Sequence, residues 1–245
     1  MTALSLSRRD LLDAGRGVTE RLAAVAFALP VGATCELRLR HDPDEAGWAR
    51  LLDLVEGAGF VLDPPPTASA RSIPAIRTWS LPDRVRTGLT VLVCGSNPSP
   101  ASSNAGVGYA RPGNRFWPAA LAAGLVEHDR DPTEALAGGM GMTDLVKRTT
   151  VRADDLSAEE NRVGLARVER LAAWFEPAVV CFVGLAGWRA AVDRRAVAGP
   201  QHHPIGRSAV YLMPSTSGLN AHEDVVSLAR HLRAARSLAE RAERA

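Results

Sequence analysis

The sequence predicts an α/β protein in which a parallel sheet is covered by helices on both faces and is preceded by a small α/β module. Downstream of residue 88, apolar runs typical of buried strands alternate with amphipathic helical segments. A Pro- and Ser-rich stretch, Pro64–Pro74, separates two regions of the chain. With 245 residues, of which 46% are hydrophobic, the chain is long enough for an ordinary domain and a small additional one.

Residues 1–88 are expected to form the N-terminal α/β module. Helical periodicity covers residues 8–29, and alternation of apolar and charged residues over Cys35–Arg40 is typical of a half-buried strand. A second helix is predicted over Asp44–Ala58, and short strands are predicted around Phe60–Leu62 and Ile76–Leu81. No chemical motif occurs here, so the module could dock a partner, regulate the protein or only stabilise it.

Residues 89–245 are expected to contain the larger sheet. The predicted strands are Thr90–Cys94, Val179–Val183, Ala209–Met213 and a short one near Met142–Leu145. The predicted helices are Asn114–Ala123, Ser157–Phe175, one from Leu185 and one from about Glu223. Ser157 followed three residues later by Glu160 forms a capping box, which marks a helix start.

Composition excludes several classes of protein. The cysteines, Cys35, Cys94 and Cys181, are far apart and form no CxxC pair, so neither a disulfide framework nor a structural zinc site is expected. The most apolar run, Leu22–Leu29, is too short to span a membrane. A net charge of +2 neither demands nor excludes a nucleic-acid partner. We expect a soluble, cytoplasmic protein that is a monomer and uses no cofactor or metal.

Two unusual loops follow strands of the larger sheet. The first is Gly95–Ser99, after Thr90–Cys94, and the second is Pro214–Asn220, after Ala209–Met213. Ligands of open parallel sheets bind beyond the carboxyl ends of the strands, and parallel pairing brings those ends to one edge. We therefore expect both loops to face a single cleft, with glycine and proline shaping the turns and serine, threonine and asparagine supplying hydrogen bonds.

These loops carry a resemblance to a known family. Gly-Ser-Asn-Pro-Ser, followed by Gly106–Trp117 with its Asn-Arg-Phe-Trp run, resembles the first motif region of the mismatch-specific uracil/thymine DNA glycosylases. That family has G-I-N-P-G, then an aromatic residue and N-R-F-W at the same spacing. Gly141–Thr150 resembles the family's middle segment and Met213–Leu219 its second motif. The similarity covers about residues 89–235 and leaves the N-terminal module unassigned.

The resemblance implies the uracil-DNA glycosylase fold, a four-stranded parallel sheet sandwiched between helices. It implies that Asn97 positions the attacking water, that Tyr109 stacks on an extruded base, and that the backbone of Ser96 and Tyr109 binds the base edge. Leu219 matches the wedge that enters the duplex. The partner implied is double-stranded DNA with a mismatched or damaged base, which would bring the protein to the nucleoid. The remaining implied contacts are with the base, from Asp144, Ser215 and Ser217, and with DNA, from Gly218 and Asn220.

The chemistry of these residues agrees with such an enzyme. A carboxamide such as Asn97 can place a water but is not a useful base, so we expect a slow enzyme. Lys147, the only lysine, lies in the middle segment and is not placed to form a Schiff base, so we expect a monofunctional hydrolase. The chain departs from the family at Ser96 and Ser99, and at Asp144, where the family often has Lys or Asn. Asp144 could accept from uracil N3–H or could repel phosphate.

Other interpretations remain open. His202 and His203 lack neighbouring carboxylates or cysteines in the sequence, so a loop near the DNA backbone is expected rather than a metal site. The arginine-rich C-terminal helix is typical of a solvated face. A non-catalytic protein that binds mismatches or lesions on the same fold is the main alternative function, and a nucleoside hydrolase is a second. The preferred lesion is left open among uracil, thymine, hypoxanthine and ethenocytosine.

Overall fold

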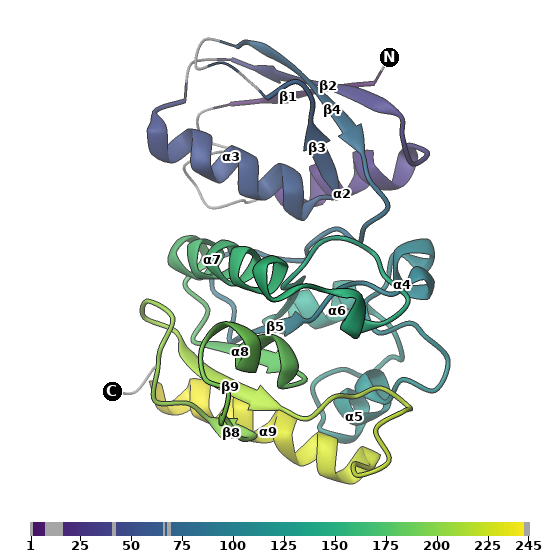
Figure 1. The fold of residues 1–245 in the computed structure, drawn as a ribbon, viewed down its shortest axis with the longest axis vertical. Helices are drawn as coiled ribbons and strands as arrows, with labels where there is room; N and C mark the ends of the chain where they lie inside the picture. The colour runs from purple at the N-terminus through teal and green to yellow at the C-terminus, as the bar shows by residue number, and fades with distance from the viewer. Residues whose placement is uncertain (1, 8–16, 41–42, 66, 68–69, 243–245) are drawn as a thin grey trace.

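The protein contains two β-sheets, and layers of helices pack against them (Figure 1). The computed structural model describes residues 2–7, 17–40, 43–65, 67 and 70–242. The part of the predicted first helix that covers residues 8–16 lies outside these ranges. Among the described residues, no helix is both long enough and apolar enough to cross a membrane.

The N-terminal sheet has the strand order β1-β2-β4-β3 and is mixed. β1 (Ala3–Leu6) runs parallel to β2 (Thr34–Leu39), whereas β4 (Ser72–Arg77) is antiparallel to both β2 and β3 (Phe60–Leu62). Helices α2 (Val18–Ala28) and α3 (Glu45–Gly57) lie between this sheet and the rest of the molecule (Figure 1). Both helices were predicted from the sequence, whereas β1 was not.

The strand β4 lies earlier in the chain than predicted. We expected it at Ile76–Leu81, but it occupies Ser72–Arg77. Pro74 made this stretch resemble a linker, because proline cannot donate a ladder hydrogen bond. The N–H of Arg77 points toward β2. Because the backbone N–H groups of successive residues in a strand point to opposite sides, the nitrogen of Pro74, three residues earlier, points toward β3. β3 ends opposite Ala75, and the missing donor therefore costs no ladder bond.

The second sheet has the order β6-β5-β7-β9-β8. Its first four strands are parallel: β6 (Met140–Asp144), β5 (Val91–Gly95), β7 (Val179–Val183) and β9 (Ala209–Met213). Every residue of β5, β6 and β7 is buried, as expected for a sheet covered on both faces. The α/β prediction is confirmed. The sheet additionally has a two-residue antiparallel strand, β8 (Gly199–Pro200), that was not expected.

Helices cover both faces of this sheet. α7 (Ala158–Phe175) and α8 (Ala186–Ala191) lie on one face, and α5 (Phe116–Ala122) and α9 (Val225–Ala242) on the other (Figure 1). The Ser157–Glu160 capping box is present. Two short helices, α4 (Pro100–Ala105) and α6 (Pro132–Ala137), were not predicted, although each begins with a side-chain cap followed by proline.

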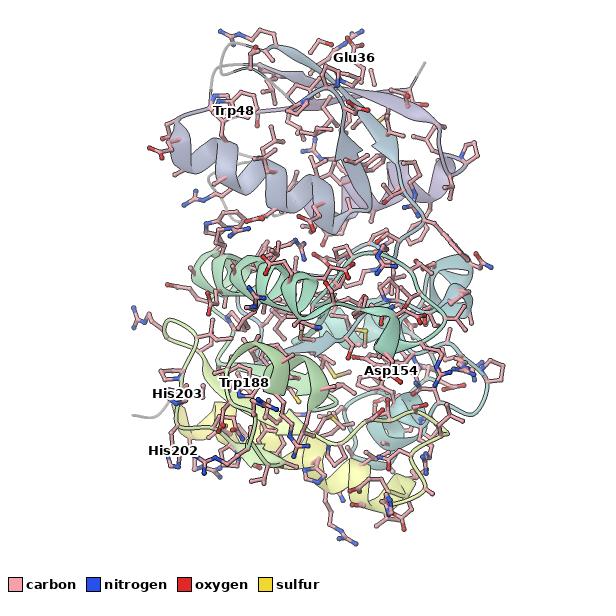
Figure 2. All side chains as sticks on the ribbon, in the orientation of Figure 1. Glu36, Trp48, Asp154, Trp188, His202 and His203 are labelled. Carbon is pink, nitrogen blue, oxygen red and sulfur yellow. The ribbon has the colours of Figure 1, made fainter. Side chains whose placement is uncertain are left out.

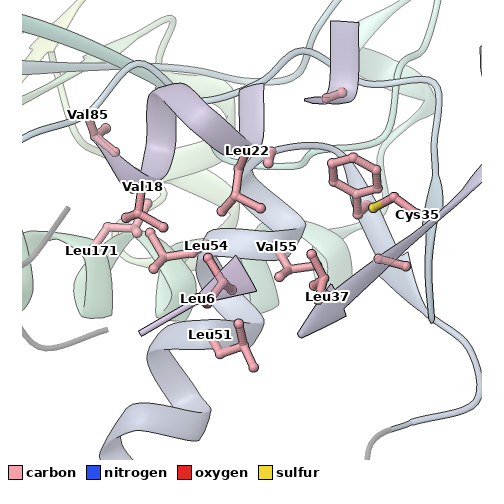
Figure 3. Close-up of a cluster of buried hydrophobic side chains, with 14 of the residues drawn as sticks. Leu6, Val18, Leu22, Cys35, Leu37, Leu51, Leu54, Val55, Val85 and Leu171 are labelled. Atoms are coloured by element: carbon pink, nitrogen blue, oxygen red, sulfur yellow. The ribbon is translucent and has the colours of Figure 1, made fainter. Parts of the chain in front are cut away.

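One hydrophobic core joins the N-terminal sheet to the second half of the chain. Leu22 of α2 and Leu51 of α3 belong to the same buried cluster as Val85 and Leu171, the latter on α7 (Figure 3). Burying this shared apolar surface stabilises both halves at once. The division into domains near residue 88 stays a prediction, because the core is continuous across it.

Candidate active site

A pocket of about 160 Å³ opens at the carboxyl ends of the parallel strands. The loops that follow β5, β6 and β9 all contribute to it, as expected from parallel pairing. Six residues singled out from the sequence line this pocket together: Ser96, Asn97, Tyr109, Asp144, Ser215 and Ser217.

The Asn97 side chain is held in one orientation. Its Nδ2 donates to the Thr150 hydroxyl at 2.8 Å and to the Pro98 carbonyl at 3.1 Å. The Thr150 hydroxyl donates in turn to the Arg152 carbonyl at 2.6 Å. Because these neighbours accept hydrogen bonds from Nδ2, the amide oxygen is left as an acceptor at the pocket wall. Thr150 lines the same pocket, and no motif in the sequence assigned it a role of its own.

The Tyr109 ring is fixed by the Asn-Arg-Phe-Trp run. It stacks on Phe116 with ring centroids 4.1 Å apart and an interplanar angle of 16°. Trp117 Nε1 donates to the Gly108 carbonyl at 2.8 Å, which holds the preceding residue of the loop. Tyr109 itself has a φ of 59°, an uncommon conformation for a residue other than glycine. One function of the run is therefore to hold this ring in a strained position.

Asp144 lies at the end of β6, opposite Gly95 of β5. A Cβ atom at Gly95 would lie 2.5 Å from Asp144 Oδ1 and 3.1 Å from the Tyr109 hydroxyl oxygen, so only glycine lets the three groups approach. Burial raises the pKa of Asp144 to about 6, and Asp83 adds to this while Lys147 opposes it. Burial and the Asp144 carboxylate also raise the pKa of Tyr109, whose buried hydroxyl has no partner among the described residues.

Arg115, the residue just before α5, holds the second loop against the start of that helix. Its guanidinium donates to the carbonyls of Ser217 at 2.7 Å and Asn220 at 2.5 Å, and also to that of Glu223. Beyond this clamp, the Leu219 side chain is 82% exposed. The result is a rigid loop that presents a bare leucine beside the pocket.

The other two residues that were predicted to bind DNA, Gly218 and Asn220, shape this loop. A Cβ at Gly218 would lie 2.8 Å from the Gly113 carbonyl, so the loop packs closely on the segment before α5. Asn220 donates from Nδ2 to the Ser215 carbonyl at 2.9 Å. Gly218 and Leu219 line a second pocket with Arg111, whereas Asn220 lines neither pocket.

A buried charge cluster next to the pocket was not predicted. Asp83 Oδ1 accepts from Lys147 Nζ at 2.7 Å and from the Thr143 hydroxyl at 2.8 Å, and Oδ2 pairs with Arg167. Burial alone would raise the pKa of Asp83, but Arg167 and Lys147 outweigh it and hold that pKa below its usual value. Lys147 is thus engaged in this cluster and does not line the pocket.

The pocket also has a wall that the motifs did not indicate. Leu81, Pro82 and Arg84, from the segment that connects the two sheets, line it. Arg84 reaches the sheet through an antiparallel bridge to Met142 of β6. No sequence signal marks these residues, because they lie outside the loops that follow the parallel strands.

His202 and His203 lie elsewhere. Both side chains are exposed and neither lines the pocket; in Figure 2 they lie at the left edge of the molecule, away from Asp154. Among the described residues there is no group of three or more side chains that could hold a metal ion.

The fold and the site together define a class. A fixed amide, a held aromatic ring and a buried carboxyl share one pocket above a parallel sheet, beside a rigid loop with an exposed leucine, an arrangement suited to holding one planar ligand. The family model of the uracil DNA glycosylase superfamily matches residues 82–238, and the chain belongs to that superfamily. Its members are DNA glycosylases, hydrolases that act on DNA in base-excision repair, which supports a glycosylase role here.

A solved structure is also similar. It is the solution NMR structure of a candidate uracil DNA glycosylase from Methanosarcina acetivorans, 19% identical in sequence. The match covers 65% of this chain and 96% of that one, with a TM-score of 0.43. The assignment to the superfamily rests on the family model and not on this structure.

Proposed function

We propose that the protein is a monofunctional, mismatch-specific uracil-DNA glycosylase that extrudes uracil or a related base from duplex DNA and hydrolyses its glycosidic bond. The observation that carries the proposal is the presence of Asn97 and Tyr109 in one pocket, with Asp144 beside them at the end of the neighbouring strand β6. An amide that orients water and a ring that holds a base are useful only if both reach the same nucleotide.

The proposed reaction begins with base extrusion. A base inside a duplex cannot be reached, so it must leave the stack at a cost of a few kcal/mol. Leu219, exposed at the tip of the loop held by Arg115, fills the space that the base leaves. A mispaired base costs less free energy to extrude, so the enzyme prefers mismatches even if it does not contact the partner base.

The extruded base then enters the pocket. Tyr109 stacks on it, the backbone of Ser96 and Tyr109 binds its edge, and the Asp144 carboxylate accepts from N3–H. The Asn97 amide oxygen accepts a hydrogen bond from a water and directs it at C1′. Thr150 supports this role, because it holds the amide nitrogen away from the water. The bond breaks through an oxocarbenium-like sugar, with the electron pair leaving on the base.

The mismatch-specific type is supported by the Gly-Ser-Asn-Pro loop and the Asn-Arg-Phe-Trp run. Asn97, unlike a carboxylate, provides no general base, so a slow chemical step is expected. Lys147 is engaged with Asp83 and with the Leu81 carbonyl, which leaves no described lysine at the pocket to form a Schiff base.

Single-turnover cleavage tests the proposal. The substrates are duplexes that are identical except for one G·U, A·U or G·T pair. Alkali added after incubation cuts the DNA at abasic sites. Wild type is expected to cut G·U fastest, and Asn97→Ala to cut it about 100-fold more slowly. Asn104→Ala is the control, because Asn104 is exposed, bonds to Trp79 and does not line the pocket.

Each contrary outcome has a defined meaning. Full activity in Asn97→Ala would remove that residue from the mechanism. Tight binding of the mismatched duplex by wild type, with no abasic product, would instead support a non-catalytic lesion-binding protein. Release of base from free deoxyuridine without any action on DNA would support a nucleoside hydrolase, in which Leu219 has no role.

A further inference from the structure

Arg84 is a positively charged residue in the pocket wall that no motif explains. It lies in the segment between the two sheets and lines the pocket together with Asp144 and Tyr109. Its backbone is fixed, because its N–H donates to the Met142 carbonyl and its own carbonyl accepts from the Met142 N–H, both at 2.8 Å. The side chain therefore starts from a rigid point at the outer edge of β6.

The N-terminal module holds the Arg84 side chain from the other side. The Arg84 guanidinium carbon lies 5.6 Å from the centroid of the Phe27 ring, a cation–π contact with helix α2. The same ring packs against Gly106, where a Cβ would lie 2.9 Å from Phe27 Cε1. Phe27 thus contacts both Arg84 and the loop that leads to Tyr109.

The Arg84 guanidinium has unused hydrogen-bonding capacity. Within the described part of the chain, no acceptor lies at hydrogen-bond distance from it and no carboxylate pairs with it, although Glu20 exerts an attraction on it. Burial lowers the pKa of Arg84 and Glu20 raises it, yet a guanidinium stays protonated in proteins. None of the Arg84 nitrogens is among the buried atoms without a partner, so water reaches them in the free protein and an acceptor on a ligand can replace that water.

We propose that Arg84 contacts the extruded base and stabilises the negative charge that the base acquires as it leaves. This inference rests on the proposed glycosylase function. When the C1′–N bond breaks, its electron pair moves to the base and spreads to the carbonyl oxygens. Water adds to C1′, and the proton that it loses passes through the solvent to the base anion. A cation placed at the base before the reaction lowers the energy of that developing charge.

The same contact selects between bases. A guanidinium only donates hydrogen bonds, so discrimination requires it to face the pyrimidine 4-position or the purine 6-position. There it pairs with O4 of uracil or thymine or O6 of hypoxanthine, and not with the exocyclic amine of cytosine or adenine. The N-terminal module then contributes to catalysis indirectly, because Phe27 on its helix α2 keeps Arg84 at the pocket. Phe27 acts here as a positioning residue.

The experiment compares two leaving groups in otherwise identical G·U and G·fluorouracil duplexes under single-turnover conditions. Fluorouracil leaves more easily, because its anion is more stable, and therefore needs less help from a cation. Arg84→Gln is expected to slow uracil release about 100-fold and fluorouracil release by less than about tenfold. Arg84→Lys, which keeps the charge, should restore part of the loss, and Phe27→Leu should show the same pattern more weakly.

Arg86→Gln is the matched control. Arg86 lies two residues further along and donates to the carbonyls of Leu136, Thr87 and Ala137, outside the pocket. It should leave both rates unchanged. An equal loss on both bases in Arg84→Gln, or no loss, overturns the leaving-group role while the glycosylase function stands. Wild type that releases neither base refutes the proposed function itself, and this inference with it.

Discussion

The side-chain amide of Asn97 donates a hydrogen bond of 2.8 Å to the Thr150 hydroxyl, although the two residues are 53 positions apart in the chain. This bond decides which atom of the amide faces the pocket. An asparagine with a free side chain would present its oxygen and its NH₂ group in turn, and only the oxygen can direct a water at an electrophilic carbon. Thr150, together with the Pro98 carbonyl, therefore commits Asn97 to one role.

Replacing Thr150 by valine is expected to slow the chemical step about tenfold and to leave DNA affinity unchanged. Valine keeps the shape of threonine but removes the oxygen that accepts from Asn97 Nδ2. Single-turnover rates on a G·U duplex and direct binding measurements check this. Thr150→Ser, which keeps the hydroxyl, should stay close to wild type. A loss of affinity with an unchanged rate would place Thr150 in DNA binding instead.

The activity is expected to fall as the pH drops through about 6, the pKa to which burial raises Asp144. Below that pH the carboxyl is protonated and cannot accept from N3–H, so the rate at low substrate should fall about tenfold per pH unit. Asp144→Asn should have a lower rate that no longer shows this acid limb. A variant that keeps the wild-type profile would assign the titration to another group.

The free energy of unfolding should change with the protonation of Asp144 in the direction opposite to the activity. The folded pKa of Asp144 lies above its unfolded value, so its contribution to stability is complete below pH 3.8 and is lost as the pH rises through about 6. Asp144→Asn is therefore expected to raise the free energy of unfolding at about pH 8 by roughly 1–3 kcal/mol, with little effect near pH 4. Urea unfolding at both pH values measures this, and equal effects at both would contradict it.

Truncating Leu219 to alanine should impair base extrusion. The loss is expected to be about tenfold on G·U and larger on A·U, because a Watson–Crick pair costs more to open than a mismatch. Val163→Ala on α7 is the control, since Val163 is also an exposed apolar residue, at 60% exposure. Single-stranded uracil DNA needs no wedge and should be cut equally well by Leu219→Ala and wild type.

The buried cluster of Asp83, Lys147 and Arg167 should be important for folding. Asp83→Asn leaves two buried cations without a full counter-charge, so it is expected to cost about 3–5 kcal/mol of unfolding free energy. Glu159→Gln, which breaks an exposed pair with Arg162, should cost less than about 1 kcal/mol. Similar values for both variants would show that the buried cluster is no more important than a surface pair.

Much of the site was predictable because its signals are local. The loop with Asn97 and the loop with Leu219 each follow directly on a buried strand, and strand type is visible in a run of neighbouring apolar residues. Once the strands were known to be parallel, their loops had to meet at one edge. The polar residues of those loops therefore line one pocket, except Asn220, whose side chain bonds to the loop itself.

The remaining features depend on contacts between residues far apart in the chain. Arg84 carries no motif, and only the bridge to Met142 and the ring of Phe27 place it at the pocket. Likewise, nothing near Asp83 in the sequence indicates that Lys147 and Arg167 will meet it in the core. By itself the sequence determined the α/β class, most of the strands and the chemistry of the loops, because these follow from the residues next to each position. The tertiary structure alone decided which side chains close the pocket and which charges are buried together, because burial and proximity arise only when distant segments pack.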